Sequence, residues 1–543
     1  MKRAPYLSPS IQRVGSEPCN PFRLGSTPCC TEIDGVAVSR LVGEHGSPLF
    51  VFSEATLRAK YREAHRAFAR RYPDVQFAWS YKTNYLNAIC RVFHQEGAIA
   101  EVVSEFEYEK ARQNGIPGHD IIFNGPYKNR EILERAANEG AMIQVDNLDE
   151  LLLLGEIAAQ PERTEPIAVA LRVHLDTGTH AIWSKFGFNA DNQEALRVVR
   201  RLLQMPGLKL QGFHAHIGTF ILDPDAYRKS ATMLVRLALE AERLGAGPIR
   251  YLNLGGGFAS RARLHYQYLS PEQTTPSFDR YAEAICDTIT QAWPAGRPLP
   301  RLYLETGRAL VDEAGYLISS VVAVKRRPLA AAPTLNGVLA AYGKGAAAVS
   351  PAPTYETDRP ALVIDAGVNL LYTTAWYQPS ILPAKRCADL PAPTTVYGCL
   401  CMNIDVIREE TPLPGLTTGD QVVLHPVGAY NITQSMQFIT YRPAVVMIGL
   451  DGTVHVIRRR ENLDYVQKLE VVPKHLATKP APDETHEDDF VFVIDPGGES
   501  RDDSETLMPE QAAELESKVI ARIELHDPNR NGNSHPLRQR SQL

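Results

Sequence analysis

A lysine stands at the end of an apolar run where a buried strand is expected. The run FAWSYK covers residues 77–82, and Lys82 is followed by Thr83, Asn84 and a helical pattern. Lysine is rarely fully buried, so a strand that ends in solvent would explain this residue by itself. A desolvated lysine near cationic groups, however, has a lowered pKa and condenses with carbonyl compounds. Lys82 therefore predicts chemistry only if other strands bring suitable groups to the same place.

Two later stretches carry groups that can hold an anion. NLGGGF contains Gly255, Gly256 and Gly257 after an expected strand, and glycine lets backbone amides approach an anion such as phosphate. A sharp loop would need the same glycines. ETGRALV adds Glu305 and Arg308, and arginine suits bidentate phosphate contact, although a surface ion pair between these two residues is also common.

The stretch HAHIGTF supplies two histidines on one face of an expected strand. The period of two places His214 and His216 on the same face, and Thr219 follows in the loop. A metal would need a third ligand, and no recognisable spacing supplies one. A histidine that stacks on a ring or forms a hydrogen bond is therefore the favoured interpretation.

Together these groups match the needs of one cofactor. Pyridoxal phosphate requires a lysine, a phosphate cup and an acidic partner for its ring nitrogen. Lys82, the glycine loop with Arg308, and Glu305 offer one of each. Glu305 would keep the pyridine nitrogen protonated, so that the ring accepts the electrons released when a bond to Cα breaks.

These residues lie at the ends of short apolar runs separated by helical patterns. Helical stretches include EATLRAKYREAHRAFARRY and a segment from Asp223, as N-cap, through Pro224 at the first helical position to Gly245. Eight such strands predict a (β/α)₈ barrel, in which chemistry lies at the C-terminal strand ends, although an open doubly wound sheet remains an alternative. The runs are FAWSYK, IAEVVS, IIFNG, MIQVD, IAVALRV, LQGFHAH, RYLNL and RLYLE.

After residue 310 the pattern changes to β-type runs with turns, which predicts a second, mainly β domain. These runs are GYLISSVVAVKRR, ALVIDAG, QVVLHPVGAY and AVVMIGLDGTVHVIRR. An Ala/Pro-rich insertion interrupts them and an acidic, polar tail follows. The expected divisions are a flexible leader (1–30), a segment joining the β domain (31–46), the barrel (47–310), the β domain (311–471) with its insertion (328–353), and the tail (472–543).

Composition points to a small-molecule partner. The chain has 57 basic and 63 acidic residues and a net charge of −6, which gives no electrostatic reason to expect nucleic acid or an anionic membrane. No apolar stretch is long enough to span a bilayer, and the N-terminus lacks the apolar core of a signal peptide, so the cytoplasm is the expected compartment. Eight cysteines without zinc-site spacing predict neither a disulfide framework nor a metal site.

Nine stretches, in order, resemble the fold-type III pyridoxal-phosphate decarboxylases, which include diaminopimelate and ornithine decarboxylases. The similarity spans about residues 32–470. It implies an α/β fold with an alanine-racemase-like barrel and a C-terminal β domain, an amino-acid α-decarboxylase with pyridoxal phosphate, and a homodimer with active sites at its interface. The stretches are GSPLFVFSEATLRAKY, YKTN, EVVSEFEYEKA, WSKFGF, HAHIGT, LNLGGGF, ETGR, GCLCMNID and GAYN.

The resemblance also implies roles for individual residues. Lys82 resembles the lysine that holds the cofactor covalently, His216 the imidazole stacked on its ring, and Glu305 the partner of the ring nitrogen. Cys401 resembles a cysteine that the partner subunit contributes to protonate the carbanion, and Asp405 closes the same motif. The set that resembles phosphate ligands comprises Thr219, Gly255, Gly256, Gly257, Arg308 and Tyr430.

Two departures from the family concern the substrate. Met402 replaces the acidic residue that normally receives the substrate's distal amino group, and methionine cannot pair with an ammonium. Residues 365–377 lack the arginine that diaminopimelate decarboxylases place there for the distal carboxylate. The expected substrate is therefore a less charged amino acid or an amino-acid conjugate. A racemase, or a non-catalytic regulatory protein that binds the cofactor, remains an alternative.

Overall fold

The computed structural model describes residues 28–327 and 359–476. The barrel and the β domain both lie in one compact unit, Met1–Leu469, and the second unit is Glu470–Leu543. The predicted insertion lies wholly outside the described residues, and so does all of the predicted leader and tail except residues 28–30 and 472–476.

Eight parallel strands form a closed barrel, as predicted. Each strand pairs with the next around the ring, and the pairing of β8 with β10 completes it, which excludes the open-sheet alternative. All eight predicted runs are strands, with ends shifted by a few residues. They are β4 (Val75–Ser80), β5 (Ile99–Val102), β6 (Ile121–Phe123), β7 (Met142–Val145), β8 (Ile167–His174), β10 (Leu208–Ala215), β11 (Tyr251–Asn253) and β13 (Arg301–Leu304); a short β9 (Phe188–Asn189) pairs with β8.

Helices alternate with the barrel strands along the chain, and several begin with a side-chain cap. Ser53, Ser104, Asn129 and Asn147 each accept a hydrogen bond from a backbone amide three residues later, the arrangement that satisfies a free helical N–H. The helices are α2 (Glu54–Ala69), α3 (Asn87–Gln95), α4 (Glu105–Gln113), α5 (Arg130–Asn138), α6 (Leu148–Ala158), α7 (Glu194–Leu202), α8 (Asp225–Arg243), α9 (Pro271–Thr274), α10 (Phe278–Ala282) and α11 (Thr288–Ala292).

The predicted start of α8 needs a small correction. The helix begins at Asp225, so Pro224 occupies the N-cap position and not the first helical position. Asp223 thus lies one residue before the N-cap, although its carboxylate accepts a hydrogen bond from the Asp225 amide at 3.0 Å.

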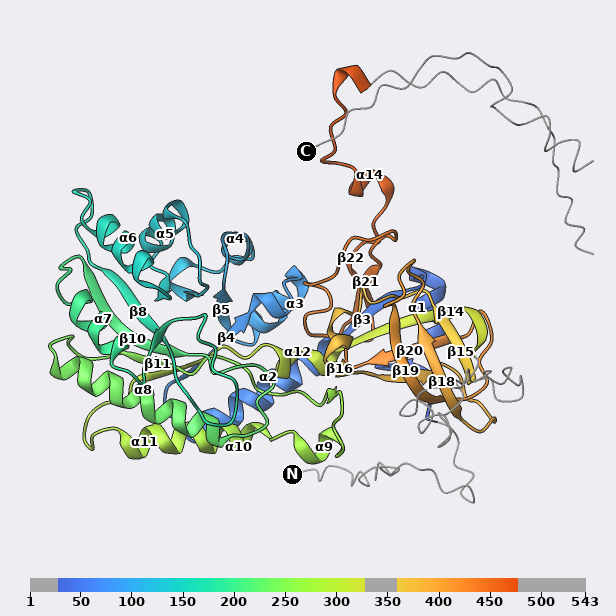
Figure 1. The fold of residues 1–543 in the computed structure, drawn as a ribbon, viewed down its shortest axis with the longest axis horizontal. Helices are drawn as coiled ribbons and strands as arrows, with labels where there is room; N and C mark the ends of the chain where they lie inside the picture. Colours follow the sequence, from blue (N-terminus) through green and yellow to red (C-terminus); the bar gives the residue numbers. More distant parts are fainter. Residues whose placement is uncertain (1–27, 328–358, 477–543) are drawn as a thin grey trace, which may run out of the picture. The chain divides into compact units, whose positions relative to one another are not determined.

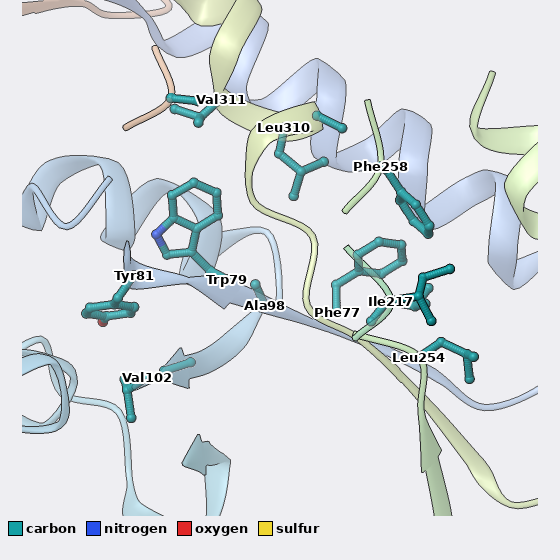
Figure 2. Packing of buried hydrophobic residues seen from close by; sticks show 14 of the residues in the cluster. Phe77, Trp79, Tyr81, Ala98, Val102, Ile217, Leu254, Phe258, Leu310 and Val311 are labelled. Carbon is teal, nitrogen blue, oxygen red and sulfur yellow. The ribbon is translucent and has the colours of Figure 1, made fainter. Parts of the chain in front are cut away.

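Strand β4 shows how alternation aims side chains in the barrel. Phe77 and Trp79 pack outward against helices, with ring-centroid distances of 5.6 Å from Phe77 to Phe68 and 4.0 Å from Trp79 to Phe93. Figure 2 shows both rings in the packed core around β4. Ala78 and Ser80 alternate with them and face inward. This packing fixes the strand end from which Lys82 follows.

The β domain combines strands from both ends of the chain. Figure 1 shows β3 among strands from the C-terminal half, and β3 pairs with β14 and β21. The predicted barrel start at Ser47 is therefore wrong: β3 belongs to the β sheet, and the barrel begins after Ser53. The strands are β3 (Leu49–Ser53), β14 (Gly315–Arg327), β15 (Arg359–Ile364), β17 (Ser380–Pro383), β18 (Ala392–Tyr397), β19 (Val406–Leu413), β20 (Gln421–His425), β21 (Ala444–Ile448) and β22 (Val454–Arg458).

Smaller elements complete the described chain. A hairpin of β1 (Glu32–Ile33) and β2 (Val36–Ala37) leads into α1 (Val38–His45), and Ile33, Val36 and Leu41 pack with β3 and β21, as expected for 31–46. β12 (Arg263–Leu264) pairs with β16 (Tyr377–Gln378), and α12 (Arg308–Val311) follows β13. α14 (Leu463–Val466) follows β22. Within the described ranges, every helix is too short or too polar to cross a bilayer.

Candidate active site

A cavity of about 700 Å³ lies at the C-terminal ends of the barrel strands. Residues from the barrel strands and from the β domain line it together. Eight of the residues singled out in the sequence are among them: Lys82, His214, His216, Thr219, Gly257, Glu305, Arg308 and Tyr430. The predicted convergence of strand ends is therefore present in the structure.

Lys82 lies in a 3-10 turn, Tyr81–Thr83, directly after β4. Its Nζ donates to Glu101 Oε1 at 2.7 Å, and 36% of its side chain remains exposed. Burial lowers the pKa of Lys82, but the carboxylates of Glu101 and Glu305 outweigh burial and raise it. The expectation of a lowered pKa is therefore wrong, because it considered cationic neighbours and missed the carboxylate that faces the lysine.

Glu101 is a site residue that the sequence analysis missed. It lies in β5, fully buried, and accepts hydrogen bonds from Ser80 Oγ and from Asn124 Nδ2, the latter at 3.0 Å. The sequence feature that could have revealed Glu101 is a charged residue inside the apolar run IAEVVS. Such a residue has to find a partner when it is buried, and Lys82 is that partner.

Glu305 follows β13 and is held by three neighbours. Asn124 Nδ2 and Asn253 Nδ2 donate to Oε1 at 2.8 and 2.7 Å, and His214 Nε2 lies 3.3 Å from Oε2. Burial raises the pKa of this carboxyl, but His214 and Lys82, together with the hydrogen bonds, bring the net pKa below its usual range. Glu305 is therefore ionised at neutral pH.

His216 is held as a neutral ring. Burial, and then the positive charges of Arg172 and Lys82, keep the pKa of His216 well below its usual range. The Gly256 amide donates to Nδ1 at 2.9 Å, so the ring proton is on Nε2. Trp183 packs edge-on against His216 with centroids 5.3 Å apart.

The glycine loop permits close backbone approach. Gly257 has φ +97°, and a Cβ there would lie 2.4 Å from the Gly218 carbonyl oxygen. A Cβ on Gly256 would lie 2.3 Å from the Glu305 carbonyl oxygen. These positions admit no side chain without a shift of backbone, so glycine is required for the loop to pack this closely against Gly218 and Glu305.

Arg308 presents a free donor beside this loop. Its side chain is 8% exposed, and its Nε has no hydrogen-bond partner within the described part of the chain. Its guanidinium lies 3.4 Å from Asp312 and stacks on Tyr377 and Tyr430, 4.2 and 5.0 Å from the ring centroids. A buried guanidinium with an unpaired N–H is suited to an anionic ligand.

The β domain also holds the turn that carries Lys82. The Tyr430 amide donates to the Thr83 carbonyl at 2.8 Å, and Thr433 Oγ1 donates to the Lys82 carbonyl at 2.9 Å. Through these two hydrogen bonds, the barrel and the β domain build one site together. Tyr430 also has φ +66°, a strained conformation for a residue with a side chain.

The remaining motif residues do not line this cavity. Cys401 is exposed, and Met402 is partly buried. The Asp405 carboxylate is buried and accepts hydrogen bonds from the amides of Val368 and Leu400 at 2.8 and 2.7 Å. Asp405 thus fixes the loop that carries Cys401 and Met402.

Other cavity residues were recognised from the sequence only as strand ends or not at all. Arg172, at the end of β8, lies 3.5 Å from Asp146 and 4.3 Å from the Phe186 ring centroid. Tyr377 comes from β16. Within residues 28–327 and 359–476, no three His, Cys, Asp or Glu side chains gather in a way that could hold a metal ion.

Comparison with known proteins identifies relatives for both domains. Residues 58–312 match the pyridoxal-binding domain of pyridoxal-dependent decarboxylases. The diaminopimelate decarboxylase of Methanothermobacter thermautotrophicus is 29% identical over 460 residues, covering 82% of this chain and 96% of the relative. That of Actinosynnema pretiosum is 29% identical over 480 residues, covering 86% and 99%.

Solved structures give the same result. The diaminopimelate decarboxylase of Methanocaldococcus jannaschii superposes with a TM-score of 0.70 at 26% identity, covering 82% of this chain and 96% of that one. A lysine/ornithine decarboxylase of Vibrio vulnificus, 20% identical, shares the fold with a TM-score of 0.60 and coverage of 77% and 98%. The chain is thus similar to pyridoxal-dependent decarboxylases over its barrel and to diaminopimelate decarboxylases over both domains, and these comparisons confirm the predicted carboxy-lyase class and pyridoxal phosphate as cofactor.

Proposed function

We propose that this protein is an α-decarboxylase of an amino acid or an amino-acid conjugate, related to diaminopimelate decarboxylase but with different recognition of the substrate's far end. The main support is one observation. The amine of Lys82, the ionised carboxylate of Glu305 and the guanidinium of Arg308, whose Nε is unpaired among the described residues, meet in one cavity.

The residues present fit pyridoxal phosphate. The phosphate would be held by Arg308, whose Nε is without a partner among the described residues, by the backbone amides of the Gly255–Gly257 loop, and by Thr219 and Tyr430. Lys82 would hold the aldehyde carbon, and Glu305 the ring nitrogen. When bound, pyridoxal phosphate supplies an electron sink for the pair released from the substrate Cα.

The chain's own residues prepare this chemistry. Ionised Glu305, fixed by Asn124 and Asn253, can keep a proton on the ring nitrogen. The neutral imidazole of His216 offers its face without adding positive charge. Lys82 has to lose a proton before it can react, and Glu101, 2.7 Å away, is the adjacent acceptor.

Substrate recognition differs from that of diaminopimelate decarboxylase in this proposal. Met402 offers no charge for a distal ammonium, and residues 365–377 offer no arginine for a distal carboxylate. Both departures favour a substrate whose far end is less charged.

We extend the proposal to a homodimer with shared active sites. Cys401 is exposed and lies outside the lining of its own chain's cavity, and Ile404 beside it is 70% exposed. A second copy could place this loop over the cavity, where the Cys401 thiol would donate the proton that replaces the lost carboxylate.

The experiment is a release assay on the purified full chain with bound pyridoxal phosphate. Carbon dioxide release from a panel of free and conjugated amino acids supports a decarboxylase, whereas inverted substrate without release, detected by chiral analysis, indicates a racemase. Cofactor absorbance without turnover of any substrate indicates a binding protein, and absence of cofactor absorbance contradicts the whole proposal.

The shared site has its own test. Inactive Lys82→Ala and Cys401→Ala chains are mixed and allowed to exchange subunits. Recovery of activity that neither variant has alone supports a site built from two chains, and failure to recover activity in a proven mixed dimer contradicts it.

A further inference from the structure

Much of the cavity wall is aromatic or aliphatic. Trp183 and Phe186 face the cavity from the loop after β8, and Trp376 lies beside β16, with 50% of its surface exposed. Its ring meets Tyr372 edge-on at 5.3 Å. Covering apolar surface of this kind with the apolar part of a ligand removes it from water, which favours binding. The residues of this wall include Trp183, Phe186, Phe220, Leu264, Trp376 and Tyr377.

The charges on the wall disfavour an ammonium group. Among the described residues that line the cavity, Glu101 and Glu305 are the carboxylates. Glu101 already pairs with Lys82, and Glu305 receives two amides and faces His214. Arg172 and Lys185 share the lining and would repel a further cation. An ammonium entering here would lose hydration without gaining a free carboxylate.

The cavity also has room for more than a cofactor. Its volume of about 700 Å³ lies within the range typical of sites for drug-sized ligands. A bulky side chain can therefore be accommodated next to the groups assigned to pyridoxal phosphate.

We propose that this site selects an amino acid whose side chain is bulky and uncharged, and discriminates against side chains that end in an ammonium group. The proposal rests on the decarboxylase function proposed above and names the substrate class of that same site. The uncharged side chain covers Trp183, Trp376 and Leu264, whereas a lysine side chain brings a cation to a wall that already carries Arg172 and Lys185.

Lysine and Nε-acetyl-lysine form the matched test pair, because they differ only in the terminal charge and its acetyl cap; phenylalanine and norleucine are the free uncharged comparisons. Binding to the full-chain holoenzyme is followed by tryptophan fluorescence, since Trp183 and Trp376 line the cavity while Trp79 and Trp293 are buried. We expect Nε-acetyl-lysine to bind at least about tenfold more tightly than lysine. Lysine binding as tightly as its acetylated form, or more tightly, overturns the proposal.

The free and the conjugated forms are distinguished in the same titration. Tighter binding of phenylalanine and norleucine than of lysine assigns the site to free apolar amino acids; tight binding of Nε-acetyl-lysine alone assigns it to conjugates. Both results support an uncharged side chain. If no amino acid releases carbon dioxide while this order of binding holds, the decarboxylase function fails and the selectivity stands.

A charge placed in the wall tests the cause. Trp376→Glu adds a carboxylate to the wall. Trp376→Gln adds a side chain of nearly the same size as glutamate but without the charge. We expect Trp376→Glu to bind lysine about tenfold more tightly than Trp376→Gln does, with both binding phenylalanine more weakly than the native chain. Tyr266→Gln is the control, because Tyr266 is an exposed aromatic residue outside the lining. It should change neither the affinity for lysine nor the affinity for phenylalanine. Equal lysine binding by the two Trp376 variants overturns the proposal.

Discussion

Two lysine–glutamate pairs in the barrel have the same chemistry and different surroundings. Lys82 pairs with Glu101 at 2.7 Å, and Lys128 pairs with Glu150 at 2.8 Å. Lys128 also donates to the carbonyls of Gly125 and Gln144, so its three N–H groups are satisfied, and its side chain is fully buried. Lys82 keeps 36% of its side chain exposed at the cavity.

The two pairs thus differ in access and not in the pairing itself, and the role proposed for Lys82 depends on its exposure to the cavity. Lys128 ties the loop after β6 to β7 and α6, and it is not among the residues that line the cavity. Burial raises the pKa of Glu150 even though Lys128 acts in the opposite direction. Each pair therefore predicts a different consequence when its lysine is removed.

The largest expected effect follows removal of the cavity lysine. Lys82→Ala removes the amine that would hold the cofactor, and we expect carbon dioxide release to fall by at least about 10³-fold. The absorbance of covalently held pyridoxal phosphate should disappear, while the far-ultraviolet circular dichroism stays native. A variant that keeps both the absorbance and the rate would contradict the assignment of Lys82.

Removal of the buried lysine should instead cost stability. Lys128→Met leaves Glu150 buried without its partner, and we expect the free energy of unfolding to fall by about 3–5 kcal/mol. The double variant Lys128→Met with Glu150→Leu replaces both charges by apolar groups and should recover most of that loss. Urea unfolding of the three chains measures this. A single variant as stable as the native chain would show that Lys128 is not essential to the fold.

The sequence predicted what depends on periodicity and missed what depends on pairing across strands. All eight strands were located, because apolar runs and parallel strand ends are local signals. Glu101 was missed, and so the direction of the Lys82 pKa shift was wrong, because β5 meets β4 only once the barrel has formed. The assignment of β3 to the β sheet likewise rests on pairing with β14 and β21, which lie more than 250 residues further along the chain.

A third glutamate near the reactive pair gives a pH-dependent prediction. Burial raises the pKa of Glu107 to about 7; Glu101 adds to this, while Lys82 and the Val103 amide oppose it. An unfolded glutamate has a pKa of about 4.3. Between these values the folded chain binds the proton more tightly than the unfolded chain, so the free energy of unfolding falls as pH rises through this window.

Glu107→Gln should remove this fall, which amounts to at most about 3 kcal/mol. Urea unfolding at several pH values between 4.5 and 7.5 compares the variant with the native chain. Glu105→Gln, at an exposed residue of the same helix, is the control and should keep the native slope. Parallel slopes for native and Glu107→Gln chains would show that this carboxyl is ionised throughout.

The smallest expected effect is a shift in the pH at which the Lys82 amine becomes reactive. Glu101→Gln removes the carboxylate that raises the pKa of Lys82 but leaves its burial and Glu305 in place. We therefore expect the cofactor-free variant to react with an amine-selective acylating reagent at lower pH than the native chain does, with modification at Lys82 read by peptide mass spectrometry. Lys128 serves as the internal control, because its fully buried amine should stay unmodified in both folded chains. If the midpoint for Lys82 stays in place or moves to higher pH, burial and Glu305 alone determine the pKa of this lysine. The two pairs would then differ in access only, and Glu101 would not contribute through its charge.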